Sequence, residues 1–104
     1  TDAFRVDYVD GEQQLQLFVI DTGSAEDAGL HFDRLEEFCR GRDQTTVSTQ
    51  ITENLPMMIV DGPSKMVVFR IDHYLGGAIG MASLEVGRTA AEALARRVGN
   101  SALN

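Results

Sequence analysis

Tryptophan is absent from this 104-residue sequence, cysteine occurs once, and no apolar run approaches the length of a membrane-spanning helix. The single cysteine, Cys39, excludes a disulfide bond within the chain and is compatible with any redox compartment. A membrane-spanning helix needs about 20 consecutive apolar residues, so we expect no transmembrane segment. A hydrophobic content of 43%, with charges of both signs, is typical of a soluble globular protein.

Basic residues are scarce as well. Lys and Arg number 9 against 16 Asp and Glu, which gives a formal net charge of −7 at pH 7. The imbalance lies in residues 1–53, which hold twelve acidic and four basic residues, whereas residues 54–104 hold four and five. Because an acidic surface repels phosphate backbones and anionic headgroups, nucleic acid is not an expected partner. Basic proteins or cations are favoured instead.

The first half of the chain changes from a strand pattern to a helix pattern. Residues 4–9 and 13–20 alternate with a period of two on either side of Asp10-Gly11, which predicts a β-hairpin with a tight turn. Beyond Gly23, apolar residues recur at steps of three and four. Ser24 is the natural N-cap, and Gly41 stands where a left-handed C-cap is expected. We predict a helix from about Ala25 to Arg40.

The second half predicts a meander of four strands and a closing helix. Alternating or apolar runs cover residues 45–51, 57–60, 66–71 and 74–81, and turn-forming residues separate them. Ser83 is the expected N-cap of the last helix, which carries an apolar stripe along residues 86–98. No repeat, low-complexity tract or linker is present, so residues 1–104 are expected to form one domain.

The order hairpin, helix, four-strand meander, helix predicts an α+β fold. We expect an antiparallel sheet of about six strands with the two helices packed on one face, because this arrangement buries both helical stripes. Residues 57–60 and 66–71 are apolar on both sides, so the other sheet face is expected to be apolar and exposed. The residues expected at this ligand or interface surface are Phe18, Ile20, Met58, Val60, Val67, Phe69, His73 and Tyr74.

One stretch spells a catalytic motif. Ile20-Asp21-Thr22-Gly23-Ser24 follows an apolar strand and resembles the active-site turn of retroviral-type aspartic peptidases, and Ile79-Gly80 is similar to the Ile-Gly pair near the end of that family. The resemblance implies a homodimer with Asp21 as one catalytic carboxylate per chain, two carboxylates sharing one proton. In that family the turn leads into further β-structure, whereas residues 25–40 have a helical pattern. A strand-to-helix connection built from ordinary turn formers is the competing interpretation.

A second resemblance extends over most of the chain. The segments 21–30, 72–77 and 90–95 are similar to bacterial extracytoplasmic, lipoprotein-like domains of unknown function. The resemblance implies an α+β fold and an extracytoplasmic location, whether periplasmic, secreted or lipid-anchored, with the cytoplasm as the alternative. The sequence starts at Thr1 and not at Met, which suggests a processed or trimmed chain.

The sequence therefore favours a non-enzymatic domain that binds a protein partner, a second copy of itself or a small ligand across an apolar sheet face. The alternative is a homodimeric aspartic peptidase. No histidine or cysteine spacing fits a metal site, and no phosphate-binding loop is present, so neither metal nor cofactor is expected. His73 lies in a turn between Asp72 and Tyr74, and its interest depends on whether the fold brings it near Asp21.

Overall fold

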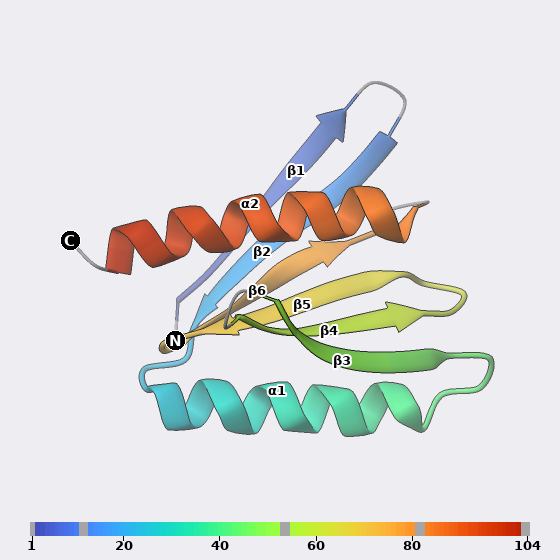
Figure 1. Cartoon of the computed structure of the whole chain (residues 1–104), viewed down its shortest axis with the longest axis horizontal. Coiled ribbons are helices and arrows are strands. Elements are labelled where there is room, and N and C mark those ends of the chain that lie inside the picture. The colour runs from blue at the N-terminus through green and yellow to red at the C-terminus, as the bar shows by residue number, and fades with distance from the viewer. Residues whose placement is uncertain (1, 11–12, 53–54, 81–82, 103–104) are drawn as a thin grey trace.

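The computed structural model describes residues 2–10, 13–52, 55–80 and 83–102, which form strands and helices in the predicted order (Figure 1). The elements are β1 (Asp2–Asp10), β2 (Gln13–Asp21), α1 (Ala25–Arg40), β3 (Thr46–Thr52), β4 (Leu55–Asp61), β5 (Met66–Ile71), β6 (Tyr74–Ile79) and α2 (Leu84–Ala102). The α+β class, with one antiparallel sheet and two helices, is confirmed. Neither helix, within the part described, is long and apolar enough to cross a membrane.

All strands lie in one sheet in the order β1-β2-β6-β5-β4-β3, and every neighbouring pair is antiparallel. The meander β3 to β6 occupies one side, as its short connections require. The hairpin β1–β2 joins it through β2 and β6, with Phe18 opposite Gly77. Figure 1 shows this hairpin extending past α2 at one end of the molecule.

Helix α1 begins as its sequence predicts. The hydroxyl of Ser24 accepts a hydrogen bond from the main-chain N–H of Asp27 at 3.1 Å, and Glu26 and Asp27 lie in the first turn, where the helix dipole favours negative charge. The predicted left-handed C-cap is wrong, because Gly41 has φ −81°. The chain continues in a right-handed turn, and the left-handed residue is Gln44, with φ 59°.

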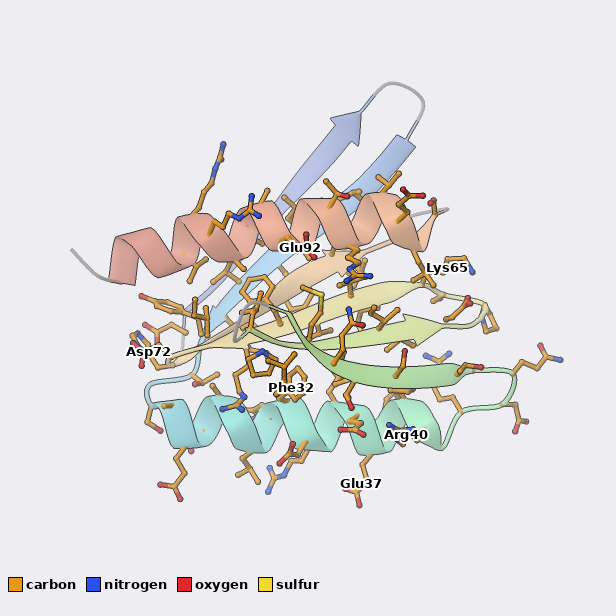
Figure 2. The ribbon with its side chains drawn as sticks, in the orientation of Figure 1. Phe32, Glu37, Arg40, Lys65, Asp72 and Glu92 are labelled. Carbon is orange, nitrogen blue, oxygen red and sulfur yellow. The ribbon has the colours of Figure 1, made fainter. Side chains whose placement is uncertain are left out.

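The two helices lie on opposite faces of the sheet, so the prediction that both pack on one face is wrong. Neighbouring residues of a strand point to opposite faces, and Met57 packs in the core cluster that includes Ala91 and Ala95 of α2. Met58 packs in the other cluster, with Phe32 and Cys39 of α1. Figure 2 shows Phe32 between α1 and the sheet. The central strands are apolar on both faces because each face carries its own helix.

Two cores therefore share one sheet. The core under α2 consists of Leu15, Met57, Val67, Phe69, Ala78, Ala91 and Ala95. The core under α1 consists of Phe32, Cys39, Val47, Met58, Val60, Val68 and Leu75. Ala91 and Ala95 of α2 are small, so they leave room between the helix and the sheet for the large side chains of the strands, such as Met57 and Phe69.

Strand β6 carries two adjacent glycines that allow close approach on both faces. The ring of Phe69 lies over Gly76, where an added Cβ would be 2.7 Å from its Cζ. On Gly77, a Cβ would overlap the main-chain carbonyl oxygen of Val67 in the neighbouring strand. The glycines in this strand therefore serve close packing in the sheet, a common reason for glycine inside a strand.

Candidate functional site

Three titratable side chains meet at the end of the sheet where β2 leads into α1 and where β5 turns into β6. The Nε2 of His73 lies 3.6 Å from Oδ1 of Asp21, and its Nδ1 lies 3.3 Å from Oδ2 of Asp72. The ring of Tyr74 stacks beside the imidazole, with centroids 4.1 Å apart. Figure 2 places Asp72 at the end of the sheet where α1 begins. The fold thus brings His73 close to Asp21. The two residues are far apart in sequence, since Thr22, which follows Asp21, is 51 positions before His73.

Thr22 ties the two turns of this cluster together. Its N–H donates to the carbonyl oxygen of His73 at 2.9 Å, and its hydroxyl lies 2.7 Å from the same oxygen and 2.9 Å from the carbonyl of Ser24. The residue is only 8% exposed. A hydroxyl has one proton to donate, and here both acceptors are main-chain carbonyls. Thr22 is therefore a structural link between the two turns.

Asp21 closes its own turn. Its Oδ1 accepts a hydrogen bond from the N–H of Gly23 at 3.0 Å, which is the local contact that aspartate makes in strand-to-helix connections. The chain then enters α1, where the peptidase motif would continue as β-structure. These contacts favour the connection interpretation of Asp21-Thr22-Gly23, and the peptidase alternative gains no support from them.

The chemistry available to the cluster is limited by its neighbours. A histidine between two carboxylates can exchange a proton, and to serve as the base of a serine-type or cysteine-type nucleophile it needs a hydroxyl or thiol beside it. The hydroxyl of Thr22 faces carbonyl oxygens, and Cys39 lies at the far end of α1. Within the described part of the chain, no three His, Cys, Asp or Glu side chains are arranged to hold a metal ion.

The thiol of Cys39 is buried in the core under α1. Burial raises the pKa of this thiol, an effect that the nearby Arg42 guanidinium partly offsets. A raised pKa keeps the sulfur protonated and unreactive near neutral pH. Cys39 is therefore a packing residue.

The residues predicted for an exposed sheet face do not form one surface. Met58 and Val60 lie under α1, whereas Val67 and Phe69 lie under α2, and all four are buried. This part of the predicted interface is wrong because each sheet face is covered by a helix. His73 and Tyr74 belong to the Asp21 cluster, and both are half-buried.

Phe18 and Ile20 remain accessible. They lie on the α1 side of β2 and are half-buried against the edge of its core. Helix α1 packs against β3, β5 and β6, whereas α2 packs against β2, β4, β5 and β6. Phe18 and Ile20 therefore lie at the margin of the area that α1 covers, where they pack against the edge of its core and keep part of their surface exposed.

Helix α1 also carries exposed apolar surface. One flank of the helix faces β5 and β3, since Gly29 adjoins the side chain of Arg70 and Arg40 donates to the carbonyl of Val47 at 3.1 Å. Phe38 lies on the opposite flank of the helix, because it is about half a turn away from Gly29 and Arg40 around the helix axis. Phe38 is 65% exposed, and Arg42 lies over its ring at 5.9 Å.

We group Phe18 and Ile20 of β2 with Leu35 and Phe38 of α1 and call these four apolar residues the β2 patch. Leu35 and Phe38 are not among the surface residues predicted from the sequence. Leu35 falls on the apolar stripe of the helix and is half-buried at the rim of the core under α1. Phe38 precedes the buried Cys39 and falls off the stripe, and an aromatic residue in that position was the available signal.

Comparison with protein-family models, with curated proteins and with solved structures finds no match to this chain. The two family resemblances and the extracytoplasmic location therefore stay predictions.

Replacing Thr22 with valine tests the link between the two turns. The variant keeps the shape of the side chain and loses the hydrogen bond to the buried end of the β5–β6 turn, so the free energy of unfolding should fall by about 1–2 kcal/mol. Urea denaturation followed by circular dichroism measures the change. Thr89→Val is the matched control, because Thr89 is exposed and its hydroxyl donates to a main-chain carbonyl of its own helix, that of Glu85, at 3.0 Å. An equal loss in both variants would contradict the assigned role of Thr22.

Proposed function

We propose that this chain is a non-enzymatic interaction domain whose β2 patch binds a protein partner that presents apolar side chains among basic residues. The observation that carries the proposal is that Phe18 and Ile20 on β2 are only partly buried, at the edge of the core under α1. Monomeric proteins rarely expose contiguous apolar surface without a use. Aromatic side chains such as Phe18 and Phe38 supply the large contact areas that dominate binding energies.

The charge of α1 supports the choice of partner. Helix α1 contains five acidic and two basic residues, and Glu26, Asp27, Asp33 and Glu37 are exposed on it. Like charges at an interface oppose association, whereas opposite charges accelerate it and favour the correct partner. A second copy of this acidic chain is therefore a poorer fit than a basic surface.

A defined pair of peptides tests the proposal. One peptide alternates leucine and lysine, and the other has the same length with glutamate in place of lysine. We expect the lysine peptide to shift the amide NMR signals of β2 and of the Phe38 flank of α1 in a saturable way, and the glutamate peptide to leave them unchanged. Shifts that map elsewhere, or that both peptides cause equally, would contradict the proposal.

Matched variants locate the binding surface. Phe38→Ser should weaken binding of the lysine peptide about tenfold, which is typical of an aromatic anchor. Leu30→Ser is the control, since Leu30 is 45% exposed on α1 but points away from the sheet and the patch. Light scattering on the free protein tests whether the patch binds a second copy of the chain instead. A dimer that Phe38→Ser dissociates would show that it does and would overturn the basic-partner proposal.

A further inference from the structure

Arg70 lies near the end of β5, close to Gly29 and Phe32 of α1. It is on β5, on the same side of the sheet as Val68 and therefore on the α1 side. The residue is half-buried. Burying a guanidinium ion costs free energy unless it is paired with an anion or hydrogen-bonded. The question is therefore which groups contact the guanidinium of Arg70.

Two residues of α1 hold the guanidinium group in place. Its Cζ lies 6.0 Å from the centre of the Phe32 ring, within the range of a cation–π interaction. Gly29, one turn earlier, has no side chain, and a Cβ there would be 3.5 Å from Nη1 of Arg70. The helix therefore passes close to the guanidinium at Gly29.

Arg70 has no acidic partner among the described residues. Its Nε is buried and makes no hydrogen bond, and no carboxylate of the described chain forms an ion pair with it. Other basic residues, Arg40, Lys65 and Arg88, pair with carboxylates at 2.8, 2.7 and 3.3 Å. Arg70 is thus a half-buried arginine with a buried, unpaired Nε in a chain with a net charge of −7, and a guanidinium without a carboxylate partner is free to bind an anion.

The surface next to Arg70 is apolar. The pairing of Met57 with Phe69 places Pro56 beside Arg70, and Pro56 pairs in turn with Ile51 of the edge strand β3. All three residues lie on the α1 side of the sheet, and Ile51 is 74% exposed. Ile51 is the most exposed of the large hydrophobic side chains in the described part of the chain.

We propose that Arg70 anchors the carboxylate of a small apolar monocarboxylic acid, whose hydrocarbon part lies over Pro56 and Ile51. The planar guanidinium can donate two parallel hydrogen bonds to a carboxylate, and its contact with the Phe32 ring, at 6.0 Å from the ring centre, favours one orientation before the ligand arrives. The site lies on the flank of α1 that faces β3, opposite the β2 patch. It is therefore independent of the protein-binding function proposed above.

Titration with hexanoate, monitored by amide NMR signals, tests this site. We expect saturable shifts at Gly29, Phe32 and Arg70, with a dissociation constant on the order of 1 mM for so small a ligand. Hexanamide, which lacks the charge, should shift these signals at least tenfold more weakly. Acetate and inorganic phosphate, which lack the hydrocarbon part, should also bind at least tenfold more weakly. Phosphate binding as tight as that of hexanoate would overturn the assignment of an apolar acid.

Variants separate a binding role from a packing role. Arg70→Met keeps an unbranched stem against Phe32 and should lose hexanoate binding at least tenfold while the midpoint of urea denaturation stays the same or rises. Arg70→Lys keeps the charge without the planar fork and should bind several-fold more weakly. Arg42→Met is the matched control, because Arg42 also lies over a phenylalanine ring but on an exposed surface, and its hexanoate affinity should not change.

Ile51→Ser completes the test. It should weaken hexanoate binding and leave the weak binding of acetate unchanged. The proposal is overturned if hexanoate causes no saturable shift in the wild-type protein, or if Arg70→Met binds it as well as the wild type does.

Discussion

Replacing Gly77 with alanine is expected to lower the free energy of unfolding by about 3 kcal/mol or more, the upper range for overpacking a rigid interior. The added methyl group would overlap the carbonyl oxygen of Val67 and approach Cα of Val68 to 2.9 Å. Both contacts are with main-chain atoms of the adjacent strand, which cannot move without disturbing the β5–β6 pairing. Domains of this size are stable by only about 5–15 kcal/mol, so much of the variant protein would be unfolded or unable to resist mild denaturant.

Gly29→Ala is the control for this prediction, with an effect of opposite sign. A Cβ at Gly29 meets only ordinary contacts with the Arg70 side chain, at 3.5 and 3.9 Å, and alanine is a better helix former by about 0.5–1 kcal/mol. Urea midpoints from circular dichroism should therefore fall for Gly77→Ala and rise for Gly29→Ala. A Gly77→Ala variant with wild-type stability would show that the two strands are less closely packed than the structure indicates.

Truncation of Phe69 to alanine is the second change with a large expected effect. Phe69 is fully buried, with 0% exposure, and its ring covers Gly76 in the next strand. Removing it leaves a cavity in the core under α2 and exposes the main chain of β6, so a loss of about 3–5 kcal/mol is expected.

Phe38→Ala provides the comparison. The same chemical change at a side chain that is 65% exposed should alter the free energy of unfolding by no more than about 0.5 kcal/mol. Thermal or urea denaturation of the two variants measures the difference. Similar losses at both positions would contradict the assignment of Phe69 to the core and of Phe38 to the surface.

Local patterns in the sequence predicted the elements because their causes are local. The helix from Ala25 to Arg40 has the predicted bounds, since Ser24 caps it and its apolar stripe is read directly from the residue spacing. The hairpins follow from alternation and turn residues in the same way. The conformation of Gly41 was predicted incorrectly because glycine permits the left-handed conformation without requiring it.

The placement of the helices could not be predicted from such patterns. Strands β2 and β3 run in the same direction, so α1 is a crossover connection whose face depends on the order of the strands between them. That order depends on the pairing of β2 with β6, which joins distant parts of the sequence. The double-sided apolarity of residues 57–60 and 66–71 was visible, and the structure explains it by one helix on each face.

The candidate sites, like the placement of the helices, depend on contacts between segments that are distant in sequence. The contact between Asp21 and His73 and the approach of Arg70 to Gly29 both join segments that are far apart in sequence. Motif spelling drew attention to Asp21, whereas nothing in the sequence around Arg70 distinguishes it from the other arginines. Its importance depends on which side chains surround it, and only the fold supplies those neighbours.

The single β2–β6 ladder that joins the hairpin to the meander has a consequence for folding kinetics. Pairing β2 with β6 requires closure of a chain segment that includes α1 and three strands, and contacts between distant segments form slowly. We therefore expect the β1–β2 hairpin to dock late in folding and to detach first in native-state opening. A partner that binds Phe18 and Ile20 holds β2 in place, so binding would suppress this opening and stabilise the whole domain.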